Sequence, residues 1–257
     1  MKTFAVLAMV AGAILMSGQA YADQYGAPEP TTKVGEFALS AGHTYYDSKW
    51  KSSDFRNSIN VSQSRIFIQG NYSPQKNWEG YIRGGAANFR SKDFYDDALG
   101  GLFGFTGFGN FNDNYQPYAA VGIKGLFYTD GIFGLGAFAQ GTYQFAEYKS
   151  TVFFGQNNSL DFRFKNPWDI TMGIAGQVKV MGITFYGGPL AYWTGARVEF
   201  EGIQAGTPSF LSTRPHENNH VGGFFGLKAP LYKRLSIMGE VQYKSDFSIG
   251  GSVVYSF

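Results

Sequence analysis

The residues best suited to chemistry in this chain form the run H-E-N-N-H at positions 216–220, which matches the zinc-peptidase pattern H-E-x-x-H. That chemistry needs a helix, because only a helix places histidines four residues apart on one face with the glutamate beside a metal-bound water. Pro215 precedes the run, its two asparagines form helices poorly, and a glycine-rich, strand-like segment follows. The sequence therefore predicts no catalytic metal and no cofactor, and His216 and His220 are left as candidates for surface metal binding only.

Two further groups could supply an acid, a base or a nucleophile, but their spacing is incomplete. Asp93, Asp96 and Asp97 gather in one polar segment, as in a solvated loop. His43 has no serine at a recognisable spacing. The chain has no Cys, which excludes thiol catalysis and disulfides, and no nucleotide or phosphate motif is present. We therefore expect a protein that is not an enzyme.

The N-terminus reads as a secretory signal. Lys2 precedes a short apolar run, and Ala20-Tyr21-Ala22 supplies a small-x-small cleavage site. The run is shorter than the ~20 apolar residues that a membrane-spanning helix needs. We expect a signal peptide at 1–22, with cleavage after Ala22, and a flexible periplasmic lead-in at 23–34 that is rich in Pro and Thr.

The composition points to strands with two unlike faces. Aromatic residues make up 18% of the chain, yet the mean hydropathy is −0.18, as expected when apolar and polar faces alternate. Without Lys2, 20 basic residues stand against 19 acidic ones, a net charge of +1. This balance gives no argument for nucleic acid as a partner.

Alternation with a period of two predicts ten strands in the region 35–257. A proline at position 189 predicts a bulge or break in the seventh strand, because proline cannot donate to a sheet ladder. A glycine-rich segment at 100–110 leaves eight or twelve strands as alternatives. The expected strands are 35–46, 64–73, 78–89, 116–127, 132–148, 168–180, 183–200, 220–228, 235–244 and 247–257.

The connections between these strands alternate in length. The segments 47–63, 90–115, 149–167 and 201–219 are long, whereas 74–77, 129–131, 181–182 and 229–234 are short. Bacterial outer-membrane barrels have short periplasmic turns and long extracellular loops. Both ends of the barrel then lie on the periplasmic side, which requires an even number of strands.

The chain ends on a strand whose outward face carries Gly251, Val253, Tyr255 and Phe257. This ending resembles the C-terminal assembly signal of Gram-negative outer-membrane β-barrels, and the resemblance extends as a class over the signal peptide and the whole mature chain. It implies an all-β, up-and-down antiparallel transmembrane barrel in the cell outer membrane. It also implies membrane lipid and the barrel-assembly machinery as partners, and we expect a monomer.

Charged residues fall on the inward faces of the expected strands. They can form ion pairs that fill a narrow lumen, or they can form a polar constriction that selects solutes. Barrels of eight strands are filled by their own side chains, and sixteen or more leave a channel, so ten lies near the filled end. The candidates are Glu36, Arg65, Glu79, Arg83, Lys124, Lys179 and Glu240.

We expect a narrow porin-like channel for small solutes. One alternative is a structural or adhesive surface protein that acts through its extracellular loops. A second alternative is a loop-site hydrolase, because an acidic loop together with His216 and Glu217 is similar in outline to the omptin proteases. The outline is incomplete, since Asp93, Asp96 and Asp97 are not spaced Asp-x-Asp and no Asp-x-His is present.

Overall fold

The computed structural model describes residues 24–52, 58–92, 111–153, 159–204, 207–217 and 220–257. All regular secondary structure in this part of the chain is β-strand, and no helix in it is long and apolar enough to cross a membrane. The strands are β1 (Phe37–Lys51), β2 (Ile59–Gln75), β3 (Trp78–Lys92), β4 (Phe111–Thr129), β5 (Phe133–Gln144), β6 (Glu147–Phe153), β7 (Ser159–Val180), β8 (Ile183–Gln204), β9 (Thr207–Thr213), β10 (His216–Glu217), β11 (Val221–Tyr232), β12 (Leu235–Tyr243) and β13 (Phe247–Ser256).

Ten of these strands close into one antiparallel barrel, which confirms the predicted count. Each pairs with its neighbours in the order β1-β2-β3-β4-β5-β7-β8-β11-β12-β13. The terminal strand β13 closes the circle on β1, from Ala38 opposite Ser256 to Tyr46 opposite Ser248. The barrel therefore has no free edge, and the backbone N–H and C=O groups of each wall strand can pair with a neighbouring strand on both sides.

The two faces of the wall have opposite character. Inward positions are polar or charged, as in β2, where Gln63, Arg65 and Gln69 are buried. Outward positions are large, apolar and exposed, which is tolerated in lipid and not in water. A soluble lipocalin-like barrel would carry its apolar residues inside, so this barrel is a transmembrane one. The exposed apolar positions of the wall include Leu39, Ile66, Ile68, Ile82, Val121, Ile123, Ile170, Met172, Ile174, Val221 and Phe225.

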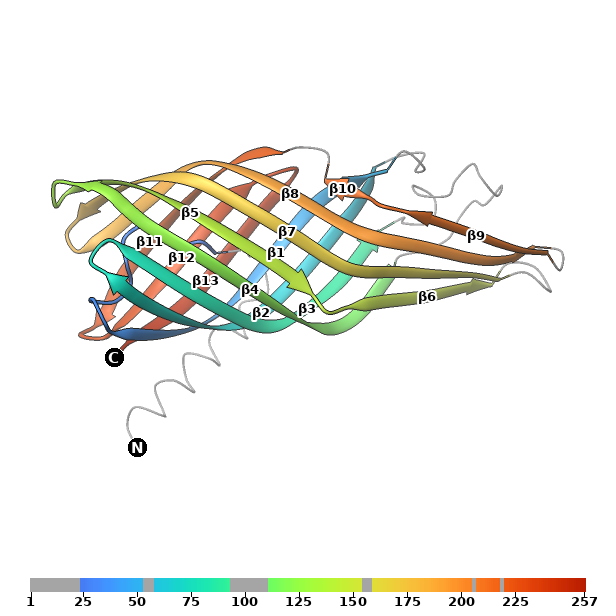
Figure 1. Cartoon of the computed structure of the whole chain (residues 1–257), viewed down its shortest axis with the longest axis horizontal. Helices are drawn as coiled ribbons and strands as arrows, with labels where there is room; N and C mark the ends of the chain where they lie inside the picture. Colours follow the sequence, from blue (N-terminus) through green and yellow to red (C-terminus); the bar gives the residue numbers. More distant parts are fainter. Residues whose placement is uncertain (1–23, 53–57, 93–110, 154–158, 205–206, 218–219) are drawn as a thin grey trace, which may run out of the picture.

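The two ends of the barrel differ in the length of their connections, as predicted. At one end lie the four short turns β2–β3, β4–β5, β7–β8 and β11–β12, together with the C-terminus (Figure 1). In bacterial barrels this is the periplasmic end. The opposite end carries the long connections and is the extracellular end.

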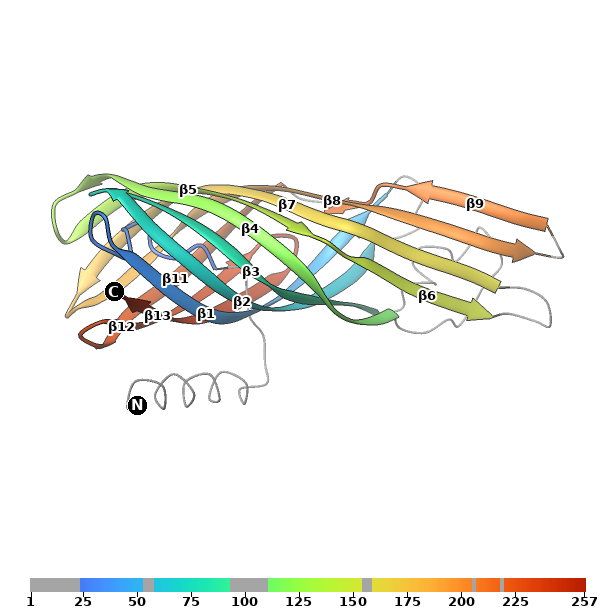
Figure 2. The ribbon, with the colours of Figure 1, turned by 60° about the horizontal axis from the view of Figure 1, so that its bottom comes forward.

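The extracellular end is more regular than the predicted loops. Strands β7 and β8 each run for 22 residues, whereas about 10 are enough to cross a membrane. The outer part of β7 that pairs with β6, Ser159–Lys165, is about 23 Å long at ~3.3 Å per residue. Strands β6 and β9 pair with the outer parts of β7 and β8, so four strands form a projecting sheet, called here the extracellular sheet (Figures 1 and 2).

The extracellular sheet corrects three sequence predictions. The segments 149–167 and 201–219 are largely strands and not loops, and the expected strand 132–148 is divided between β5 and β6. Period-two alternation is in fact present in part of these segments, as in the run Asp161-Phe162-Arg163-Phe164-Lys165, so the sequence held a strand signal that the expected loops did not use. The glycine-rich segment 100–110 lies outside the described residues.

The wall bends into the extracellular sheet at Asn166. The β7–β8 register shifts between Lys165 and Trp168, and Asn166 has a left-handed backbone (φ 48°) that asparagine tolerates. The prediction of a bulge or break at Pro189 is confirmed as a local break: the β7–β8 ladder has no paired residues between the Gly173–Leu190 pair and the Gly176–Gly187 pair, although the registers of β8 with β7 and with β11 are unchanged across it. Pro189 faces outward within an otherwise regular strand.

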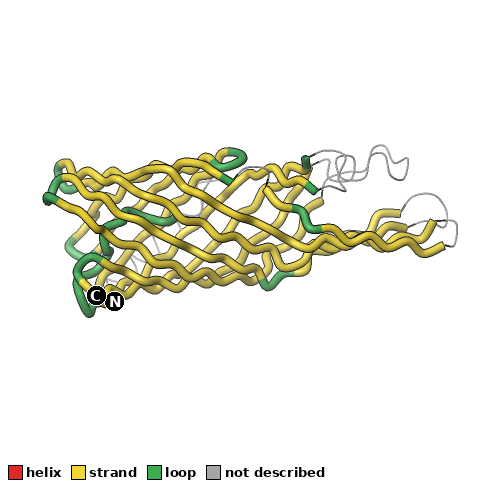
Figure 3. The backbone as a smooth tube through the Cα atoms, turned by 45° about the horizontal axis from the view of Figure 1, so that its top comes forward, coloured by secondary structure: helices red, strands yellow, loops and turns green. Residues whose placement is uncertain are grey.

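Most of residues 24–34, expected as a periplasmic lead-in, lies inside the barrel instead: residues 24–28 are buried and 29–32 partly buried, whereas Lys33 and Val34 are exposed. The segment, dark blue in Figure 1 and drawn as a green loop in Figure 3, crosses the lumen near the end that carries the C-terminus. Gln24, Tyr25 and Ala27 are buried, at 3%, 3% and 1% exposure. We call residues 24–34 the plug. The expected signal peptide at 1–22 lies outside the described residues.

Gly84 and Gly85 on β3 test how tightly the wall packs. A Cβ on Gly85 would overlap the carbonyl oxygen of Ile66 on β2, whereas a Cβ on Gly84 would meet nothing within 4 Å. We expect Gly85→Ala to lower the free energy of unfolding by about 1–3 kcal/mol, because backbone atoms cannot move aside cheaply. Gly84→Ala is the matched control and should be neutral or slightly stabilising. Urea unfolding of the refolded barrel in liposomes measures both, and equal stability of the two variants would contradict this packing.

Candidate functional site: the plugged lumen and its extracellular pocket

A buried carboxylate on β12 anchors the start of the plug. The backbone N–H groups of Tyr25 and Gly26 donate to the two oxygens of Glu240, at 3.1 and 2.9 Å. The hydroxyl of Tyr186 donates to the same carboxylate at 3.1 Å, and Gln242 donates at 2.7 Å. A buried carboxylate is costly unless several donors surround it, and the plug supplies two of the four found here.

A cation on the opposite wall holds the neighbouring carbonyl. Arg83 on β3 donates to the backbone oxygen of Gln24 at 2.5 Å and to the side chain of Gln69 at 2.9 Å. Its guanidinium also lies over the ring of Phe67, 4.2 Å from the centroid. Because Glu240 and Arg83 hold consecutive plug residues from two walls, the chain is fixed across the lumen.

The middle of the plug joins a buried ion pair. Glu79 on β3 and Lys124 on β4 are 3.2 Å apart and are 0% and 3% exposed. Thr31 donates to Glu79 from both its backbone N–H and its hydroxyl, and Asn71 donates at 2.6 Å. Removing one member of such a pair leaves an uncompensated charge and typically costs 3–5 kcal/mol.

The fourth anchor lies nearer the periplasmic rim. Glu29 of the plug forms an ion pair with Lys179 on β7 at 2.8 Å, and both side chains are partly exposed. Gln177 on the same strand donates to Glu29 at 3.0 Å and accepts from its backbone N–H at 3.2 Å. Solvent screens this pair, so it contributes less than the three buried anchors formed by Glu240, Arg83 and Glu79.

An apolar cluster receives the plug's aromatic side chain. The ring of Tyr25 stacks on Phe138 of β5 at 4.3 Å and meets Phe224 of β11 edge-on at 6.1 Å. Tyr186 and Leu190 of β8 complete the contact surface. Polar anchors and apolar packing thus act on neighbouring residues of one short segment.

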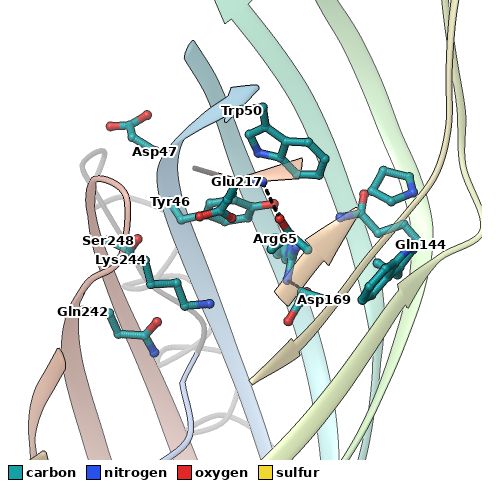
Figure 4. Close-up of a pocket in the computed structure, with 13 residues that line it drawn as sticks. Tyr46, Asp47, Trp50, Arg65, Gln144, Asp169, Glu217, Gln242, Lys244 and Ser248 are labelled. Carbon is teal, nitrogen blue, oxygen red and sulfur yellow. Dashed lines mark hydrogen bonds and ion pairs between the residues drawn. The ribbon is translucent and has the colours of Figure 1, made fainter. Parts of the chain in front are cut away.

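A second group of charges lies above the plug, toward the extracellular end. Arg65 on β2 and Asp169 on β7 are 3.5 Å apart, and both are buried. Lys244 donates to Thr171 at 3.4 Å, and Glu217 accepts from Ser245 at 2.9 Å. Figure 4 shows the side chains of Lys244 and Arg65 pointing toward one space from different parts of the wall. The open space among these side chains is about 20 Å³, enough for a single water molecule.

An aromatic cluster covers this pocket. Six large rings from five strands are buried to 1% exposure or less, with Phe89 and Phe164 4.4 Å apart and Trp50 5.6 Å from Phe164. The described lumen is therefore closed at three levels, by the plug, by paired charges and by rings. The six are Trp50, Phe89, Tyr148, Phe162, Phe164 and Phe200.

The outer face of the extracellular sheet carries a ladder of ion pairs. Lys165 lies 2.7 Å from Glu199 and 3.5 Å from Glu147, and Arg163 lies 3.1 Å from Glu201. The hydrogen bond from Lys165 holds the pKa of Glu199 below its usual value. The sheet is thus amphipathic, with rings toward the barrel axis and paired charges outside.

The structure brings most of the predicted lumen residues together. Five of them are buried in the interior: Arg65, Glu79, Arg83, Lys124 and Glu240. Glu79, Arg83 and Glu240 contact the plug directly, and Lys124 forms the ion pair with Glu79. Lys179 lies at the periplasmic edge. Glu36 does not join them: it is in the turn before β1 and is partly exposed. The role of Gly251, Val253, Tyr255 and Phe257 in assembly stays a prediction.

The zinc-peptidase pattern does not fold as its chemistry requires. His216 and Glu217 lie in the short strand β10, with Glu217 opposite Trp50 and His216 opposite Lys51. His220 contacts the carbonyl of Tyr192 at 3.3 Å. In the described part of the chain, no three His, Cys, Asp or Glu residues gather as a metal site. Asp93, Asp96 and Asp97 lie outside the described residues.

Sequence reasoning missed the partners that the lumen residues meet. The local pattern places Gln24, Tyr25, Glu29 and Thr31 in a flexible lead-in, and Asp169 is not among the predicted lumen residues. A signal was present, since a segment without strand pattern held an aromatic residue and a carboxylate directly before the barrel. Its docking depends on residues as far as 215 positions away, which no local pattern reveals.

No protein-family model matches the chain, and no curated protein sequence is similar to it. Among solved structures it is similar to the outer membrane protease OmpT of Escherichia coli, at 11% identity and a TM-score of 0.47, over 86% of this chain and 95% of that one. It is also similar to the outer membrane protein OprG of Pseudomonas aeruginosa, at 12% identity and a TM-score of 0.47, over 90% and 99% of the two chains. The translocator domain of the autotransporter NalP of Neisseria meningitidis matches at 11% identity and a TM-score of 0.44, over 100% and 94%.

Glu217 should make the stability of the protein depend on pH. It lies in the extracellular connection on β10, and burial raises its pKa from 4.5 to about 7 in the folded protein. A carboxyl whose pKa is raised by folding stabilises the protein fully below its unfolded pKa and loses that contribution as pH rises through the folded pKa. Wild type should therefore lose about 3 kcal/mol between pH 4.5 and 7 relative to Glu217→Gln. Urea unfolding at pH 4.5 and pH 8 measures this difference, and parallel pH profiles of the two proteins would refute it.

Proposed function

We propose that this protein is a monomeric outer-membrane barrel that acts at the cell surface through its extracellular sheet, with the plugged barrel as its anchor. In this proposal membrane lipid surrounds the wall, and the assembly machinery recognises the last strand. The observation that carries the proposal is the continuation of β7 and β8 as paired strands well beyond the membrane, joined by β6 and β9.

The contacts and charges of the extracellular sheet favour a stable surface that projects from the membrane. Its inner rings pack on Trp50 and Phe89 of the barrel mouth, which holds it to the wall. Its outer face pairs charges of both signs, and such a face is soluble without repelling partners of either charge. A passive porin needs neither feature, and the described lumen offers it no open path.

Removal of the sheet tests this role. The N–H of Asn166 donates to Ala146 and the N–H of Ala196 donates to Pro215, so each pair can be joined by a short turn. We expect a variant with 147–165 and 197–214 replaced by Gly-Ser turns to fold as a barrel. Cells that display it should lose at least about 10-fold of their attachment to wells coated with collagen, fibronectin or laminin, or of their attachment to one another.

The control for this experiment exchanges one ion pair and keeps the sheet. Arg163→Glu combined with Glu201→Arg preserves the pair and should leave attachment intact. Heat-dependent migration in gels verifies that every variant is a closed barrel. Unchanged attachment of the sheetless variant on all of these surfaces would exclude the surface role.

The plug favours a second candidate function, a gated channel for small solutes. Residues 24–34 are held by hydrogen bonds, ion pairs and one aromatic stack, with no covalent link to the wall. Inward glycines such as Gly85 and Gly173 thin the wall's inner surface. If the plug leaves, the polar faces of β3, β4 and β12 would line the periplasmic part of a passage, and the Arg65–Asp169 pair and the aromatic cluster above it would have to move aside for a solute to cross.

Deletion of 24–32 combined with Glu240→Gln tests the channel. The second change avoids leaving an uncompensated carboxylate where the plug was bound. We expect wild type to show almost no conductance in planar bilayers and the variant to show discrete steps, at least about tenfold more frequent. Glu240→Gln alone, with the plug present, is the control. A silent deletion variant would show that side chains fill the lumen without the plug and would remove the channel as a candidate.

A further inference from the structure

A serine and a histidine meet on the outside of the barrel. The Nε2 atom of His43 on β1 lies 2.5 Å from the hydroxyl oxygen of Ser64 on β2. Both side chains are partly exposed, whereas Thr44, Gln63 and Arg65 beside them are buried in the interior. Because strand side chains alternate, His43 and Ser64 face the membrane. The pair is 21 residues apart in sequence, which is why no local motif shows it.

Two neighbouring groups complete the surroundings of Ser64. The phenolic oxygen of Tyr115 on β4 lies 3.1 Å from the Ser64 hydroxyl oxygen, and Tyr115 is 48% exposed. The side-chain oxygen of Asn88 on β3 accepts the backbone N–H of Ser64 at 2.7 Å. Four adjacent strands thus contribute one outward residue each to a single polar row.

The number of hydrogens on each group decides which group donates in each hydrogen bond. Ser64 has one hydroxyl hydrogen, and when it points at His43, Tyr115 must be the donor of the second bond. A serine hydroxyl bound to a neutral imidazole nitrogen is the arrangement that activates serine as a nucleophile. Tyr115 then places an O–H donor 3.1 Å from the Ser64 oxygen, within reach of a carbonyl oxygen on the carbon that Ser64 attacks, where negative charge develops.

The depth of the row decides what can reach it. Toward the membrane centre, the next outward positions are Ala41 on β1 and Ile66 on β2, and the wall is apolar beyond them. Toward the extracellular end, Asp47 and Arg90 begin the charged rim. The row therefore lies at the boundary between acyl chains and headgroups, where the ester bonds of membrane lipids lie.

We propose that His43, Ser64 and Tyr115 form a lipid esterase site on the membrane-facing wall, whose substrate is the carboxylic ester of an acyl chain in the surrounding leaflet. The Ser64 oxygen bonds to the ester carbonyl carbon while its proton passes to Nε2 of His43, and Tyr115 donates to the oxyanion. Collapse breaks the ester C–O bond, and the departing alcohol takes the proton from His43. Water then adds to the acyl carbon and gives a proton to His43; the Ser64 oxygen leaves, regains that proton, and the fatty acid is released.

This site is separate from the extracellular sheet and the plug. None of its residues faces the lumen, so its activity does not depend on whether the barrel binds a partner or conducts. The ester can come from a glycerophospholipid or from the acylated sugar of lipid A, and the two substrates are assayed apart.

The first test is covalent labelling of the refolded protein. A fluorophosphonate probe should form an adduct on Ser64 of wild type, located by mass spectrometry. Ser64→Ala should lose that adduct, and His43→Gln should lose nearly all of it. Ser62→Ala is the matched control, because Ser62 is the next outward serine on β2 and donates to Asp47 at 2.6 Å instead of to a histidine; it should label as wild type does.

The second test is release of fatty acid from dioleoylphosphatidylcholine in mixed micelles and, in a separate arm, from purified lipid A. We expect Ser64→Ala to abolish release, His43→Gln to lower kcat by about 100-fold or more and Tyr115→Phe by about 100-fold. Ser62→Ala should keep the wild-type rate, and heat-dependent gel migration verifies that each variant is folded. Release from one arm identifies the lipid. Folded wild type that labels nothing at Ser64 and releases nothing in either arm, or Ser64→Ala with a wild-type rate, would overturn the proposal.

Discussion

The closure of the hydrogen-bonded wall is the constraint on which the rest of this structure depends. In lipid, a backbone N–H or C=O without a partner costs several kcal/mol, so a sheet must close on itself to span the membrane. Strand β13 makes that closure against β1. The closed wall then has an apolar outer face and a polar inner face. The plug and the buried ion pairs lie against the inner face, and the polar row around Ser64 lies on the outer face.

The polar side chains inside the barrel need hydrogen-bond and ion-pair partners. Ten strands enclose a space too narrow for bulk water, so Glu240, Arg83 and Glu79 need fixed donors and acceptors. The plug supplies them from its backbone, which can satisfy acceptors and donors on opposite walls at once. The same segment that fills the lumen therefore also stabilises the charges there, and a channel would have to replace both contributions when it opens.

The two ends of the wall are used differently. At the periplasmic end the turns are as short as strand geometry allows, and the plug enters there. At the other end β7 and β8 do not stop at the membrane, and the bend at Asn166 redirects them into the extracellular sheet. The outer wall at the same end carries the polar row around Ser64. The proposed surface binding, the proposed gating and the proposed ester chemistry thus have separate locations on one scaffold.

The sequence by itself determined the class, the ten barrel strands, the short turns and the inward charges, because alternation with a period of two and turn residues are local properties of the chain. It did not determine which charge meets which partner. Arg65 pairs with Asp169 and Glu240 with the plug only because closure brings distant strands around one axis. His43 gains Ser64 in the same way, through strand register. Those contacts join residues far apart in sequence, and only the tertiary structure decides them.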